Sequence, residues 1–138
     1  IVWILLLLAM KKYKQSGILI LFGVTKAMQD DQIGTLKRLH FDANVLNGDS
    51  PRDVRQKFAD MKGQLWAIGP EMLQNHFVRE VLRKPALASK VLPMLVDEAH
   101  TIKDWGQTWR PDILKLCEIR DVLGPSSAGG LFSAIMSR

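Results

Sequence analysis

The sequence predicts an α/β fold in which a parallel sheet carries helices on both faces. Short apolar runs bounded by Gly or Pro alternate along the chain with longer stretches of helical periodicity. Such uniformly apolar strands are typical of a sheet covered on both faces, and parallel neighbours need crossover connections. The chain has 138 residues, 47% of them hydrophobic, which is enough for a buried core. We therefore expect one domain over residues 1–138.

The N-terminal run Ile1–Met10 is apolar, but about 18 residues are needed to span a bilayer. Lys11, Lys12 and Lys14 follow this run, whereas the positive charges of a signal peptide precede it. We interpret the run as a buried element of the core and expect no membrane span. The first residue is Ile rather than Met, which indicates a fragment of a longer protein.

Gly17–Gly23 is predicted to be a central strand, because an apolar run lies between two glycines. Thr25 then begins a helix whose apolar residues recur at near-helical spacing, namely Met28, Ile33, Leu36 and Leu39. Asn44–Leu46 fits a second strand. Ser50–Pro51 predicts a helix start with a serine cap, and Gly63 is expected to end that helix.

Leu65–Ile68 predicts a strand, and Glu71–Arg83 predicts the helix that follows it, ended by Pro85. Val91–Val96 is one more apolar strand. The C-terminal part predicts a helix and then a strand, over Pro111–Leu123 and Leu131–Met136. In parallel sheets, ligands bind beyond the carboxyl ends of the strands. The segments that follow these strands are therefore the candidates for a site.

Charge and cysteine content exclude several classes of protein. The chain has 19 Lys and Arg against 14 Asp and Glu, a net charge of +5 that is compatible with a polyanion partner without requiring one. Cys117 is the only cysteine, so there is no internal disulfide partner and no cysteine-based zinc site. The sequence contains neither G-x-S-x-G nor H-E-x-x-H, and the histidines are scattered.

Asp97-Glu98-Ala99-His100 is the sharpest local signal, because four apolar residues lead directly into two adjacent carboxylates. In a phosphoryl-transfer site, the first carboxylate can hold Mg²⁺ through water and the second can orient or deprotonate the attacking water. The alternative for these residues alone is a solvated acidic turn at the end of a strand.

Trp105, Trp109 and Arg110 follow in a polar stretch. Indole faces can stack on unpaired bases, and an arginine can add a phosphate contact or a second stack. The alternative is that both rings pack into a small core beneath the loop.

These segments resemble RecQ-type DNA helicases of superfamily 2. The DEAH tetrapeptide Asp97–His100, the pair Trp105-Gly106, the run Trp109–Pro111 and a Leu-rich helix ending at Leu123-Gly124 match motif II and the aromatic-rich loop of that family. Upstream, Phe22–Gln32 is similar to motif Ia. The pair Leu46-Asn47 and the run Ile68–Met72 also fall on family motifs, so the resemblance covers roughly residues 18–124.

The resemblance implies the first RecA-like lobe of a P-loop NTPase that uses ATP and Mg²⁺. Asp97 would hold the magnesium ion through water, Glu98 would be the catalytic base, and His100 would relay the nucleotide state to the loop. Another group would contact single-stranded or forked DNA: Trp105, Trp109, Arg110, Gly69, Pro70, Glu71 and Lys26, with Thr25 a weaker candidate.

The departures from the family pattern bear on activity. The chain contains no G-x-x-x-x-G-K-S/T, the Walker A signature, and the family's motif would lie just before Ile1. Gly124–Leu131 has the glycine spacing but Gly-Leu in place of Lys-Ser/Thr, so it is predicted to be a loop. Gly23-Val24 replaces Ser-Pro in motif Ia, and Ala134–Ser137 resembles motif III without its threonines. The 138 residues are expected to include no part of the family's second lobe, which carries its arginine finger.

The function implied is that of a fragment of an ATP-dependent 3′–5′ DNA helicase. It would be nuclear in a eukaryote and cytoplasmic otherwise. The isolated chain is expected to show no measurable DNA-stimulated ATPase, because phosphoryl transfer depends on the missing cradle and lobe. The alternatives are a non-catalytic DNA-binding relic and an inert fragment. A Walker A motif encoded in frame upstream would favour the enzyme.

Overall fold

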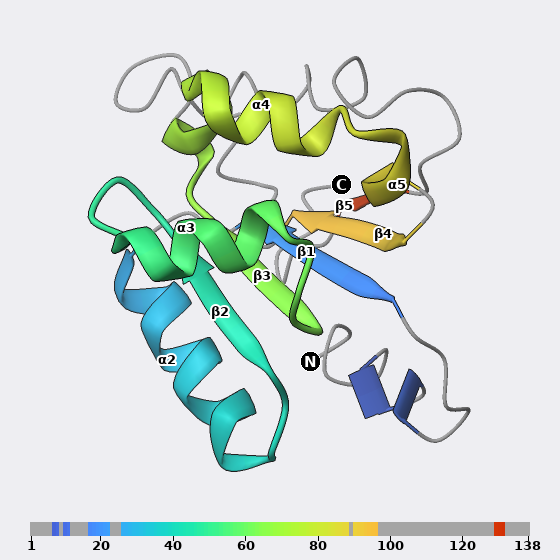
Figure 1. Cartoon of the computed structure of the whole chain (residues 1–138). Coiled ribbons are helices and arrows are strands. Elements are labelled where there is room, and N and C mark those ends of the chain that lie inside the picture. The colour runs from blue at the N-terminus through green and yellow to red at the C-terminus, as the bar shows by residue number, and fades with distance from the viewer. Residues whose placement is uncertain are drawn as a thin grey trace, which may run out of the picture.

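The computed structural model describes residues 7, 8, 10, 11, 17–22, 26–88, 90–96 and 129–131 (Figure 1). They form a five-stranded sheet in the order β2-β3-β1-β4-β5, and every neighbouring pair is parallel. The strands are β1 (Ile18–Phe22), β2 (Ala43–Leu46), β3 (Leu65–Ile68), β4 (Val91–Val96) and β5 (Gly129–Leu131). The predicted parallel sheet is confirmed.

Helices cover both faces of this sheet. They are α2 (Lys26–Arg38), α3 (Arg52–Ala59), the 3-10 helix η1 (Pro70–Gln74), α4 (His76–Leu82) and α5 (Pro85–Ala88). Side chains alternate along a strand, so Ile18, Ile20 and Phe22 of β1 join one core with α3, α4 and α5. Leu19 and Leu21 join a second core with α2. In Figure 1, α4 and α5 lie above the sheet, α3 lies over β2 and β3, and α2 lies at the lower left beside β2.

The N-terminal residues contribute to the second core. Leu7 and Met10 are helical and buried, with 1% and 8% of their surface exposed, and they pack with residues of α2 and β1. Leu8 is 45% exposed, so two of the three described residues of the predicted apolar run belong to the core. Among the residues that the structure describes, none of the helices combines the length and the apolar character needed to cross a membrane.

The ends of α3 differ from the sequence prediction. Ser50 does not cap the helix: its hydroxyl accepts a hydrogen bond from the Asn47 N–H at 2.9 Å and lies 3.3 Å from the Val45 carbonyl oxygen, to which it donates. At the other end, Met61 takes a left-handed φ of 55°, two residues before Gly63. The N–H groups of residues 61 and 62 then bond the carbonyls of residues 58 and 57, which is a Schellman motif. The prediction that glycine ends this helix was wrong.

The predicted helix Glu71–Arg83 is two helices. A 3-10 turn, η1, comes first, and Asn75 then starts α4 by accepting a hydrogen bond from the Phe77 N–H at 3.0 Å. An asparagine that caps a helix interrupts the regular spacing of the apolar residues without erasing it. Pro85 does not only end a helix, because it is also the first residue of α5.

The C-terminal prediction needs one correction. Gly129–Leu131 forms strand β5 beside β4, so the predicted loop Gly124–Leu131 ends in a strand. The rest of that loop lies outside the described residues, as do the predicted helix Pro111–Leu123 and all but the first residue of the predicted strand Leu131–Met136.

Candidate functional site at the carboxyl edge

All five strands end in one row. The last residues of β2, β3, β1, β4 and β5 are register partners across the sheet, in the order Leu46, Ile68, Phe22, Val96 and Leu131. No strand extends beyond its neighbours, so the segments that follow begin at the same edge. We call this the carboxyl edge. It is the part of a parallel sheet where ligands bind.

Three of the predicted motifs follow strands that end here. The segment after β1 leads to Lys26, and the segment after β3 is Gly69-Pro70-Glu71. Val96, the last residue of β4, precedes the predicted acidic pair in the sequence. The predicted residues from that point on lie outside the described part of the chain, and their roles stay predictions: Asp97, Glu98, His100, Trp105, Trp109 and Arg110.

Lys26, the first residue of α2, forms an ion pair with Asp49 from the loop between β2 and α3. The hydrogen bond and the charge of Asp49 raise the pKa of Lys26, and the charges of Glu71 and Asp30 add to this effect. The same bond lowers the pKa of Asp49. Both side chains are largely exposed. The amine is therefore charged and accessible, but it has carboxylates on several sides.

Hydrogen bonds to Asn47 and from Arg55 hold the loop that carries Asp49. The Asp49 N–H donates to the Asn47 side chain at 3.0 Å, and the Ser50 N–H donates to the Asn47 carbonyl at 3.1 Å. Arg55 of α3 donates to the carbonyls of Ser50 and Gly48, both at 2.9 Å. These bonds hold the backbone from which the Asp49 side chain extends toward Lys26.

Gly69, Pro70 and Glu71 make the turn from β3 into η1. The Gly69 N–H donates to the Leu46 carbonyl at 3.3 Å, which ties this turn to the end of β2. A Cβ on Gly69 would lie 2.2 Å from Oε1 of Glu71, so the Glu71 side chain folds back over its own turn. Pro70 and Met72 of η1 are buried. The structure therefore brings Lys26 and the Gly69–Glu71 turn to the same edge, as predicted.

Sequence reasoning missed Asp49 and Arg55. The only local signal was Asn47-Gly48-Asp49-Ser50, a run of turn-forming residues that predicts a loop without predicting its partners. Nothing in the linear order connects Asp49 to Lys26, which lies 23 residues earlier.

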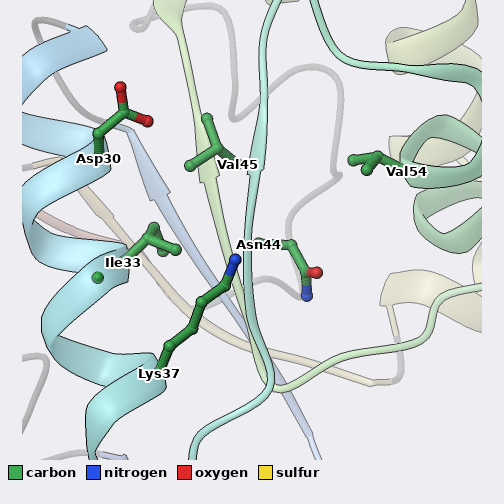
Figure 2. Close-up of a pocket in the computed structure, with 7 residues that line it drawn as sticks. Asp30, Ile33, Lys37, Asn44, Val45 and Val54 are labelled. Carbon is green, nitrogen blue, oxygen red and sulfur yellow. The ribbon is translucent and has the colours of Figure 1, made fainter.

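A hollow of about 320 Å³ lies elsewhere, beside the edge strand β2 (Figure 2). Asp30, Ile33, Gly34 and Lys37 of α2 line one side, Asn44 and Val45 of β2 form the floor, and Val54 of α3 lies opposite. None of the predicted site residues lines it. Within the described ranges, no group of three or more His, Cys, Asp or Glu side chains is arranged to hold a metal ion.

Comparison with solved structures defines the class of the fold. The chain matches the DUF1998 helicase MrfA, in a crystal structure with DNA and AMPPNP, with a TM-score of 0.64 and 21% identity over 91% of this chain and 18% of that one. This likeness shows the fold, which is that of a helicase RecA-like domain. No protein-family model matches the chain.

Sequence comparison narrows the class. The chain is 30% identical over 112 residues to the ATP-dependent DNA helicase RecQ of Synechocystis sp., covering 78% of this chain and 23% of the relative. It is 31% identical over 115 residues to the probable ATP-dependent DNA helicase RecS of Bacillus subtilis, covering 81% and 22%. The chain is therefore a relative of the RecQ-type DNA helicases, as its motifs predicted. It spans less than a quarter of the length of these two relatives.

Proposed function

We propose that this chain is most of the first motor lobe of an ATP-dependent DNA helicase, one that translocates 3′ to 5′ along single-stranded DNA. The observation that supports the proposal best is the common end of the strands. The strands before motif Ia, before Gly69-Pro70-Glu71 and before the acidic pair all finish in one row. A motor that couples nucleotide hydrolysis to DNA movement needs these segments side by side.

In this proposal Asp97 holds Mg²⁺ through water and Glu98 orients the attacking water, while His100 links them to the neighbouring loop. Bound Mg²⁺ would neutralise charge on the phosphates of ATP. The given sequence contains no G-x-x-x-x-G-K-S/T, so it supplies no Walker A cradle for the phosphates. The isolated chain is therefore expected to hydrolyse no ATP. Turnover by the purified chain that Glu98→Gln abolishes would contradict this.

In this proposal Trp105, Trp109 and Arg110 contact single-stranded DNA. Lys26 and the Gly69–Glu71 turn lie along the path of the same strand, which we call the DNA track. The parent protein would act in the nucleus of a eukaryote and in the cytoplasm of a bacterium. The same contacts would be retained in the alternative, a DNA-binding relic without catalysis. The DNA-binding experiment therefore tests what both share, and the hydrolysis experiment separates them.

The binding experiment titrates the purified chain with a fluorescein-labelled oligo-dT strand. Stacking contributes about 1–3 kcal/mol per base, so Trp105→Ala and Trp109→Ala should each weaken binding by about 5- to 150-fold. Trp66→Phe is the control once urea unfolding shows it folded under the assay conditions, because Trp66 is fully buried in the core and cannot meet a base. If the two loop variants bind as tightly as the control, the proposed DNA contact is wrong.

A further inference from the structure

The described part of the amino edge of the sheet is rich in positive charge. Three connections return there to begin β2, β3 and β4, over residues 37–42, 57–64 and 83–90. They hold two carboxylates, Asp42 and Asp60, against seven cations, which are Lys37, Arg38, Lys57, Lys62, Arg83, Lys84 and Lys90. This excess of five equals the net charge of the whole chain, and the remaining 12 cations and 12 carboxylates balance. We call the seven cations the basic rim.

The rim is continuous around its first carboxylate. Lys57 Nζ lies 2.5 Å from Asp42 Oδ1 and 3.1 Å from Asn44 Oδ1. Burial raises the pKa of Asp42. The hydrogen bonds from Lys57 and Asn44 and the charges of Lys57 and Lys37 together outweigh burial, so the pKa lies below its usual value. The connections into β2 and β3 thus share one cluster of charges, in which two lysines face one carboxylate.

The second carboxylate joins the connections into β3 and β4. The hydrogen bond from Gln56 and the charges of Lys62 and Lys84 lower the pKa of Asp60. Lys62 Nζ lies 3.4 Å from Asp60 Oδ2, and its side chain is 69% exposed. Lys84 is exposed as well. Contacts therefore join the connections into β2 and β3, and the charge of Lys84 from the connection into β4 acts on the same cluster.

Helix dipoles explain only part of this arrangement. Helices that cross over a parallel sheet end at its amino edge, and cations in their last turns are stabilising there. Lys37 and Arg38 of α2 and Lys57 of α3 fit that explanation. Lys62, Lys84 and Lys90 do not, because each follows the end of its helix by two or three residues and is exposed to solvent.

Two connections at the carboxyl edge are acidic instead. The connections that leave β2 and β3, residues 47–53 and 69–75, hold one arginine, Arg52, against three carboxylates. The described part of the chain has two exposed large hydrophobic residues, and one of them, Leu39, lies in the connections that carry the basic rim. A surface with many exposed cations and a single apolar residue suits the phosphates of a nucleic acid. Among the described residues, one exposed leucine is too little apolar surface to insert into a lipid layer.

We propose that the basic rim is a second nucleic-acid contact, which binds the phosphate backbone on the side of the sheet opposite the predicted DNA track. Lysine and arginine neutralise phosphates and release their counterions, so this contact is independent of base sequence and weakens with salt. It would hold a second segment of DNA while the carboxyl edge engages the single strand. The rim is described throughout, so this proposal does not depend on the aromatic loop.

The test measures how binding of the purified chain to a 20-base-pair duplex and to oligo-dT changes with salt. Replacing both Lys62 and Lys84 with Gln should make the slope of log K against log salt less steep by about two for the duplex, with affinity roughly tenfold lower at low salt. The Lys62→Arg, Lys84→Arg double variant is the matched control and should keep the slope. Asp60→Asn removes a carboxylate from the rim and should tighten binding.

Two outcomes would overturn the proposal. One is the same slope of log K against log salt for the Gln and the Arg double variants, measured on proteins with equal urea midpoints. Equal slopes would show that Lys62 and Lys84 contact no phosphate. The other is weaker binding by Asp60→Asn. The chain with Trp105→Ala and Trp109→Ala separates this test from that of the carboxyl edge. It should keep its salt-dependent duplex binding even though its affinity for oligo-dT falls.

Discussion

Replacing Gly63 with Ala is expected to destabilise the protein by about 2–3 kcal/mol. Gly63 has a φ of 106°, and a side chain in left-handed backbone costs about 1–2 kcal/mol. A Cβ there would also lie 2.9 Å from Asn44 Nδ2 and 3.2 Å from Trp66 Nε1. Both atoms are held, because Asn44 donates to Asp42 at 3.0 Å and Trp66 donates to the Lys62 carbonyl at 2.9 Å. Losing one such bond adds about 1 kcal/mol.

Gly34 provides the matched control, because the same substitution there should have the opposite sign. It lies in the middle of α2, and a Cβ built on it meets no atom within 4 Å. Gly→Ala in a helix stabilises by about 0.5–1 kcal/mol, because the unfolded chain loses conformational freedom. The two alanine variants should therefore differ by about 3 kcal/mol, or roughly 10 °C in Tm for a chain of this size.

Urea unfolding followed by tryptophan fluorescence measures both changes. The midpoint should fall for Gly63→Ala and rise for Gly34→Ala, with the slope of the transition unchanged in both variants. A Gly63→Ala protein as stable as the unmodified chain would refute the reasoning. It would mean that neither the backbone conformation nor the contact with Asn44 constrains this position.

The remaining predictions concern a cap, a buried hydrogen bond and an ion pair. Asn75→Ala should lower the unfolding free energy by about 1 kcal/mol in urea titrations, because α4 loses its cap; an unchanged midpoint would exclude the capping role. Trp66→Phe should cost about 2 kcal/mol in the same assay, because a buried ring shrinks and the Lys62 carbonyl loses its donor; a Lys62→Ala variant, which keeps that carbonyl, should cost far less. Because the pKa of Asp42 is lowered in the folded protein, its pairing with Lys57 stabilises the fold fully at pH values above the unfolded pKa of about 4. This stabilisation is lost as the pH falls through the pKa of the folded state. The stability difference between the unmodified chain and Asp42→Asn should therefore shrink on acidification, and a difference that is constant from pH 7 to pH 3 would contradict the pairing.

Local patterns were sufficient to find most of the elements. Leu65–Ile68 and Val91–Val96 are strands with the predicted bounds. An apolar run between turn residues leaves few alternatives for such segments. The errors fall at the ends of helices. Met61 takes the left-handed conformation that follows α3, whereas Gly63 was expected to end this helix, and Asn75 interrupts a periodic stretch. Both depend on hydrogen bonds that apolar spacing does not encode.

The candidate site was predictable only in part. Lys26 and the Gly69–Glu71 turn were named from their similarity to helicase motifs, and they do lie at the same edge. Asp49 was not named, although it is the ion-pair partner of Lys26. A loop aspartate has no signature of its own, since its effect depends on which segment the fold brings next to it. The roles of Asp97 and the residues after it stay predictions.

By itself, the sequence determined which segments become strands, that the sheet is parallel, and that the chain is related to RecQ-type helicases. These properties follow from patterns written continuously along the chain. Only the tertiary structure decided that five strands end in one row, that Asp49 meets Lys26, and that seven cations from three connections form one rim. Strand order and register determine which distant segments become neighbours, and hydrophobic periodicity carries no record of either.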